Sequence, residues 1–187
     1  MGSPPSLRGK RAPWGARRPR VRFVVTGEWS RNRLLQTIVV LYVIYVAGLW
    51  LTNALLYFNK MALTPSSVTA YYLGNEEQFL QPRTYQGLLE VTHFHLFAMG
   101  MLLLVLTHLM LFVPVRNGVK AWLIAIPFLA AALDEGASWL VRFAHPAFAW
   151  LKITGFLLLQ GSLLVLMGVA LWAVFRGSGQ SYRSSEE

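Results

Sequence analysis

The sequence predicts an all-α integral membrane protein, a four-helix bundle with a short interfacial helix in its first outer loop. The chain has 187 residues, of which 55% are hydrophobic, and its mean hydropathy is +0.46. Its apolar residues gather in runs of about 20, the length that crosses the hydrocarbon core of a bilayer as a helix. We therefore predict one membrane domain over residues 34–176, with spans at about 35–58, 88–113, 121–143 and 146–175.

The basic residues are concentrated before the first span, and they give the chain most of its net charge of +9. We interpret residues 1–33, which are also rich in Pro and Gly, as a cytoplasmic arm that contacts anionic lipid and does not bind nucleic acid. Residues 177–187 form a polar tail. Because basic residues also flank the same ends of the later spans, the positive-inside rule places both termini in the cytoplasm. We expect a multi-pass protein of the bacterial inner membrane.

The first span holds one strongly polar residue, Asn53, which we interpret as a helix-packing residue. In the loop that follows, Thr64 and Pro65 have the pattern of a helix start, because a hydroxyl caps the first turn and proline fits the first helical position. Gly74 and Asn75 have the pattern of a helix end. These signals predict a short helix that lies on the bilayer surface or caps the bundle.

The second span is apolar, yet it carries Glu90 near its start and three histidines, His93, His95 and His108. Ionisable residues inside a membrane are costly and therefore indicate a functional site. In a helix, His93 and His95 point about 200° apart, so only one of them faces a given pocket. His108 lies about 22 Å from His93 along the helix axis, toward the cytoplasm.

The third and fourth spans add ionisable residues at the outer end. Asp134 and Glu135 lie in the second half of the third span, and Arg142 lies near its exit. His145 is at the turn that starts the fourth span, and Lys152 follows two turns later. Because the second and fourth spans begin on the outer side and the third ends there, we expect these groups to meet the outer histidines in the outer third of the bundle.

This arrangement predicts a b-type haem between the second and fourth spans, near the outer face. Two imidazoles from neighbouring helices can ligate one iron from opposite sides, and the predicted pair is His93 or His95 with His145. The chain has no cysteine, which excludes a covalently attached c-type haem. Small residues would give the macrocycle clearance, and basic residues would pair with its propionates. We assign Gly100 and Gly155 to the clearance, and Arg142 or Lys152 to the propionates.

Two histidines about four turns apart on one helix resemble the membrane b-type cytochromes, in which paired haems stack across the bilayer. The resemblance covers His108 together with His93 or His95. In that family each histidine has a partner on another helix, and here His145 is available to the outer one only. The resemblance therefore implies at most one bis-histidine haem. It also implies electron transfer between a quinone pool or a periplasmic cytochrome and other membrane subunits.

The same residues support other sites. A copper or zinc ion would take His93 or His95 with His145 and an acidic residue of the third span. A chlorophyll-type pigment needs only one axial histidine. A proton or quinone site would use the acidic pair of the third span together with Lys152, without a metal.

A further alternative is a cofactor-free accessory or assembly subunit of a larger bioenergetic or photosynthetic complex. The polar groups would then satisfy one another: His93 would hydrogen-bond Glu135, Asp134 would pair with Lys152, and His145 would cap the fourth span. The sequence has no catalytic triad pattern, P-loop or zinc-protease motif. It therefore favours a non-catalytic or electron-transfer subunit over an enzyme that acts alone.

Overall fold

The computed structural model describes residues 33–179. Within this range the elements follow one another as α1 (Arg33–Lys60), α2 (Pro65–Leu73), α3 (Tyr85–Met110), α4 (Asn117–Phe143), the 3₁₀ turn η2 (Pro146–Phe148) and α5 (Ala149–Gly179). All but the last residue of the predicted basic arm, and most of the predicted polar tail, lie outside the described residues.

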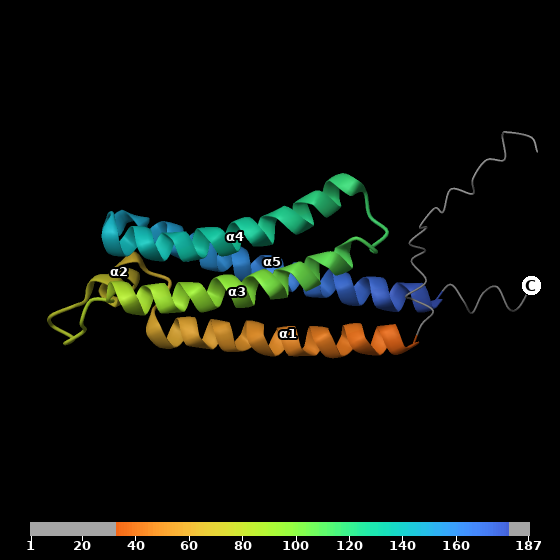
Figure 1. The fold of residues 1–187 in the computed structure, drawn as a ribbon, viewed down its shortest axis with the longest axis horizontal. Helices are drawn as coiled ribbons and strands as arrows, with labels where there is room; N and C mark the ends of the chain where they lie inside the picture. The colour runs from red at the N-terminus through yellow and green to blue at the C-terminus, as the bar shows by residue number, and fades with distance from the viewer. Residues whose placement is uncertain (1–32, 180–187) are drawn as a thin grey trace, which may run out of the picture.

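α1, α3, α4 and α5 run side by side as a bundle (Figure 1). Each is long and apolar enough to cross a membrane. At 1.5 Å per residue, the 27 residues of α4 extend about 40 Å, more than the hydrocarbon core of a bilayer. Large apolar side chains cover the outside of the bundle, and Phe94 and Phe97 of α3 are each 72% exposed. The predicted all-α membrane bundle is confirmed, and the chain is an integral multi-pass membrane protein.

α5 is the helix on which the core is built. Its buried side chains Leu159 and Leu166 share one apolar cluster with Val46 of α1 and Leu106 of α3. α1 packs mainly against α5, and α3 packs against α4 and α5, whereas α1 and α3 make few contacts with each other. A space between α1 and α3 on the membrane side follows from this arrangement.

α2 begins and ends where the sequence predicts. The Thr64 hydroxyl accepts a hydrogen bond from the Ser67 amide, and Gly74 ends the helix with φ at +87°. A Cβ on Gly74 would lie 2.7 Å from the Leu80 carbonyl oxygen, so this position requires glycine. Of the two predicted locations, α2 takes the cap of the bundle, where it packs against α4 and α5 with Val68 fully buried.

α3 ends at Met110, three residues before the predicted end at Val113. The Leu111 amide already binds the carbonyl three residues back, at 3.1 Å, rather than four. Pro114 is the physical reason, because a proline disfavours helical geometry in the residue before it. The Lys120 ammonium then donates to the Leu111 carbonyl oxygen at 2.7 Å and satisfies this end of the helix.

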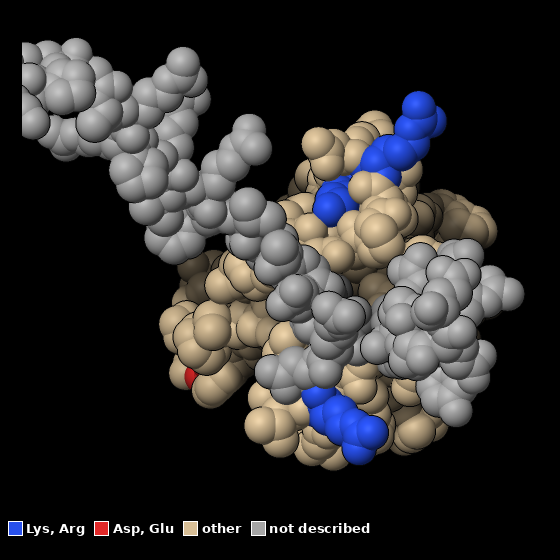
Figure 2. All heavy atoms as spheres, turned by 90° about the vertical axis from the view of Figure 1, so that its right-hand side faces the viewer, with Lys and Arg blue, Asp and Glu red and all other residues tan. Residues whose placement is uncertain are grey.

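The described chain begins and ends at one end of the bundle, opposite α2 (Figure 1). Figure 2 looks onto that end and shows Lys and Arg side chains with very little acidic surface among the described residues. The helix bounds place Arg33, Arg116 and Lys120 there. This charge pattern is the one that the positive-inside rule associates with the cytoplasm, and the cytoplasmic location of the termini stays a prediction.

Candidate functional site

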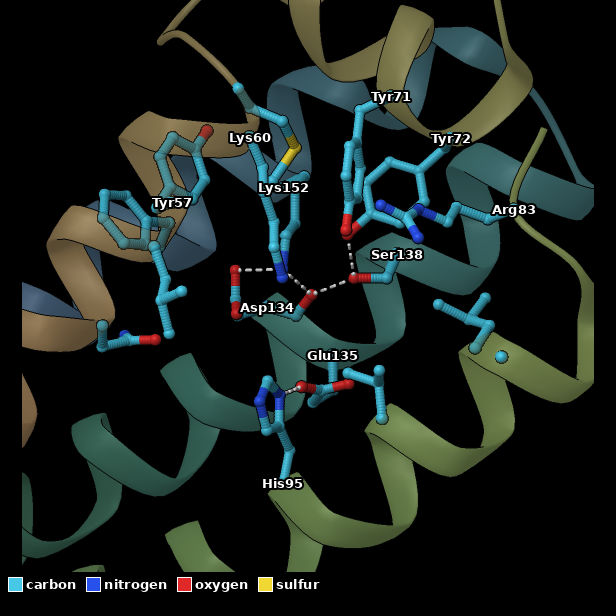
Figure 3. Close-up of a pocket in the computed structure, with 17 residues that line it drawn as sticks. Tyr57, Lys60, Tyr71, Tyr72, Arg83, His95, Asp134, Glu135, Ser138 and Lys152 are labelled. Carbon is cyan, nitrogen blue, oxygen red and sulfur yellow. Dashed lines mark hydrogen bonds and ion pairs between the residues drawn. The ribbon is translucent and has the colours of Figure 1, made fainter. Parts of the chain in front are cut away.

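A buried ion pair joins α4 to α5 near α2 (Figure 3). The Lys152 Nζ lies 2.8 Å from a carboxylate oxygen of Asp134, and it also donates to the Asp134 carbonyl oxygen at 3.1 Å. The two side chains are only 8% and 14% exposed. An unpaired charge at such a place would be strongly destabilising, so each group compensates the other. The predicted pairing of Asp134 with Lys152 is confirmed.

Gly155 allows α5 to come this close to α4. A Cβ on Gly155 would lie 2.8 Å from the Asp134 backbone nitrogen and 2.9 Å from its Cα. The space that the haem hypothesis reserved at Gly155 is therefore occupied by the α4 backbone. Gly100 has the same predicted role, and a Cβ added there would meet no atom within 4 Å, so this position faces open space.

A second acid–base pair lies beside the first and joins His95 of α3 to Glu135 of α4 (Figure 3). The His95 Nδ1 is hydrogen-bonded to one carboxylate oxygen of Glu135. The other oxygen accepts from the Thr92 hydroxyl at 3.2 Å, and Thr92 in turn accepts from the Trp139 indole at 2.9 Å. The hydrogen bond to Glu135 that the cofactor-free alternative assigns to His93 is therefore made by His95, because His95 is the histidine that faces α4.

α2 contributes a chain of hydrogen bonds that ends at the ion pair. The Tyr72 hydroxyl donates to the Ser138 Oγ at 2.9 Å, and Ser138 donates to the Asp134 carbonyl oxygen at 3.2 Å. Burial raises the pKa of Tyr72 above its ordinary value. The phenol therefore keeps its proton at neutral pH and remains a hydrogen-bond donor.

These groups line a polar cavity of about 130 Å³ beneath α2 (Figure 3). Lys60 and Arg83 line it as well, and both are exposed. The Tyr57 hydroxyl is buried in its wall and has no hydrogen-bond partner among the described residues. A buried polar atom of this kind usually meets water or a ligand, and the volume is enough for several waters. The cavity is therefore large enough to place water or a small polar ligand beside the paired residues.

The other three histidines do not line this cavity. His93 and His108 are exposed on α3, and each ring contacts a phenylalanine. His145 caps η2, where its Nδ1 accepts a hydrogen bond from the Ala147 amide at 3.1 Å. The cofactor-free alternative predicts this capping role. Across residues 33–179, no three His, Asp or Glu side chains are grouped so that they could hold a metal ion. The haem, pigment and copper or zinc assignments stay predictions.

Arg142 and Glu90 also lie away from the two pairs. The Arg142 Nε donates to the Arg83 carbonyl oxygen at 2.6 Å, so Arg142 fastens the loop before α3. Glu90 is exposed and accepts from Gln86 of the same helix at 3.1 Å. Of the predicted site residues, the structure therefore brings together His95, Asp134, Glu135 and Lys152, with Gly155 behind them.

Four participants were missed by reasoning from sequence. Tyr72 joins the site only because α2 folds over α4, which no local pattern reveals. Thr92 and Trp139 are ordinary residues of membrane spans until their partners are known. Ser138 carried a usable signal, because it lies four residues after Asp134 and so shares its helix face.

Comparison with known proteins agrees with this architecture. Residues 62–181, more than half of the chain, match the Aq_1264_TM family, which is described as a transmembrane helical domain. No curated protein and no solved structure matches the chain.

Proposed function

Since the chain belongs to the Aq_1264_TM family of transmembrane helical domains, we propose that it is the membrane subunit of an electron-transfer complex in which the two acid–base pairs exchange a proton. One observation carries the proposal: Asp134 and Glu135 are consecutive residues of one membrane helix, and each has a basic partner from a different helix. Ionisable residues inside membranes mark proton relays and ion pathways.

The formal charges explain why a proton would be exchanged. Lys152 balances one carboxylate, so the cluster carries one excess negative charge when His95 is neutral. One additional proton on the pair formed by His95 and Glu135 makes the cluster neutral. An unbalanced charge inside an apolar bundle is costly, so a change in nearby charge, such as reduction of a redox partner, favours uptake or release of that proton. Such coupling is what a subunit that links electron transfer to proton transfer requires.

The exposed fractions of the two side chains indicate the direction in which the proton moves. The Glu135 side chain is only 13% exposed, whereas His95 is 46% exposed. Because both line the cavity beneath α2, a proton can pass between the buried carboxylate and the cavity through the imidazole. The cavity lies at the end opposite the described termini, which is the predicted outer side. A quinone or a periplasmic cytochrome on that side would be the redox partner.

The experiment is redox-induced infrared difference spectroscopy on the complex purified from its native membrane. We expect carboxyl bands that respond when the complex is reduced and that disappear in Glu135→Gln. Glu90→Gln is the matched control, because Glu90 is an exposed acid of the same membrane region and is not part of the cluster. Redox-linked bands that are identical in both variants, or no redox-linked carboxyl band at all, would contradict the proposal.

The same preparation tests the b-type haem predicted from the sequence. A reduced-minus-oxidised visible spectrum would show an α-band if haem is bound, and a band held by the predicted pair would be lost in His145→Ala. The proton-exchange proposal needs no haem in this chain, because electrons can also reach the cluster's neighbourhood through a partner subunit.

A further inference from the structure

A groove of about 420 Å³ runs along the bundle between α1 and α3. Its walls are almost entirely apolar, and they include Leu49 and Leu56 of α1 and Met101 and Val105 of α3. Leu49 is 42% exposed and Met101 is 50% exposed, so the groove opens toward the lipid. The groove exists because α1 packs against α5, and α3 against α4 and α5, while α1 and α3 make few contacts with each other. Its volume lies within the range of about 300–1,000 Å³ that is typical of ligand sites.

Two polar side chains with unused hydrogen-bonding atoms meet at the outer end of this groove. Asn53 of α1 and His95 of α3 both line it, and both also line the cavity of the acid–base pairs. Among the described residues, the Asn53 amide has no hydrogen-bond partner, and His95 uses only its Nδ1. A buried or half-buried polar group in a membrane span normally finds a partner. The sequence-based interpretation of Asn53 as a packing residue therefore does not account for its amide.

We propose that this groove binds a neutral lipid-soluble carbonyl compound of the quinone class, with its head at Asn53 and His95 and its apolar tail between α1 and α3. The inference rests on the proposed function and names the carrier that meets the proton-exchanging pair. The Asn53 amide can donate to a carbonyl oxygen, and the free His95 Nε2 can donate to a carbonyl or accept from a hydroxyl. The site can therefore hold both the carbonyl and the hydroxyl form of the head.

A phospholipid fits this groove less well. Asn53 lies seven residues before Lys60, which ends α1, so the head position is about 10 Å deeper than the end of the helix. A charged headgroup would have to leave the interface to reach it. The nearest buried cation, Lys152, is already paired with Asp134, and the remaining carboxylate would repel a phosphate. A neutral head with hydrogen-bonding oxygens meets neither obstacle.

The test is photolabelling of the full-length protein in phosphatidylcholine nanodiscs, with an azido-benzoquinone that carries a decyl tail. We expect labelled peptides from α1 and α3, and protection by excess unlabelled benzoquinone. Ala98→Phe and Met101→Trp, which fill the groove, and Asn53→Leu, which removes the amide, should each reduce specific labelling about tenfold, the effect of about 1.4 kcal/mol. Val165→Trp is the matched control, because Val165 is 51% exposed and lines a crevice between α4 and α5 that shares no residue with the groove.

Labelling spread evenly over lipid-facing helices, or equal in the groove variants and Val165→Trp, would overturn the inference. So would a failure of excess unlabelled benzoquinone to protect the labelled peptides. Thermal unfolding of each variant identifies any that fails to fold, and the remaining variants then decide. If labelling fails while the Glu135-dependent infrared band persists, only this inference falls. If labelling succeeds without that band, the groove remains a quinone site and the proton-exchange proposal falls.

Discussion

At the scale of single residues, Gly155 fixes the distance between α4 and α5 at the polar cluster. The backbone of Asp134 occupies the place where a Cβ on Gly155 would lie. Lys152 is one helical turn before Gly155, so the same close approach brings its ammonium to the Asp134 carboxylate. The geometry of the ion pair therefore depends on the absence of a side chain one turn away.

Replacing Gly155 with Ala should destabilise the protein by about 1–3 kcal/mol, because a backbone atom cannot yield in the way that a flexible side chain can. The measurement is chemical or thermal unfolding in detergent. Gly161→Ala is the control, since a Cβ there meets no atom within 4 Å and should cost nothing. Equal stability of the two variants would show that α4 and α5 can separate without penalty.

The sequence could identify the acid–base residues but could not choose among the histidines. Asp134 and Lys152 are rare ionisable residues of adjacent antiparallel spans, so topology alone brings them together. His93 and His95 diverge by about 200° on a helical wheel, and either could face the bundle. The choice depends on where α4 packs against α3, which is a tertiary fact. As a result, the hydrogen bond to Glu135 was predicted for the wrong histidine.

At the scale of elements, α2 turns an open bundle end into an enclosed site. Local signals predicted both of its boundaries, because Thr64 and Gly74 act through their own backbone neighbours. Its contribution to the site could not be predicted in the same way. Tyr72 reaches Ser138 across 66 positions of sequence, and that contact follows from how α2 packs on α4 and α5.

A double-mutant cycle measures this contact. Tyr72→Phe and Ser138→Ala should show a coupling free energy of about 1 kcal/mol in unfolding, because each removes the same buried hydrogen bond. Tyr71→Phe combined with Ser138→Ala is the control, since Tyr71 neighbours Tyr72 but makes no such bond. A coupling for Tyr72 no larger than that for Tyr71 would mean that α2 is held by its apolar side chains alone.

At the scale of the whole molecule, the bundle separates its polar chemistry from its basic end. Both acid–base pairs, the cavity and the head position of the groove lie toward α2, whereas the described chain begins and ends at the opposite end (Figure 1). Hydrophobic run lengths were sufficient to predict four spans, because the bilayer dictates helix length. They could not predict the groove between α1 and α3, which arises because α1 packs on α5 whereas α3 packs on α4 and α5.

The central claim is that one proton is shared between His95 and Glu135, and histidine NMR tests it most directly. The chain has four histidines, so ¹⁵N labelling of histidine gives a simple spectrum, in which His95→Gln identifies the His95 signals. We predict that Glu135→Gln shifts the His95 ring resonances, because it replaces the group bonded to Nδ1, and leaves the other three histidines unchanged. Glu90→Gln should leave the His95 resonances unchanged. Ring resonances of His95 that do not respond to Glu135→Gln would contradict the account.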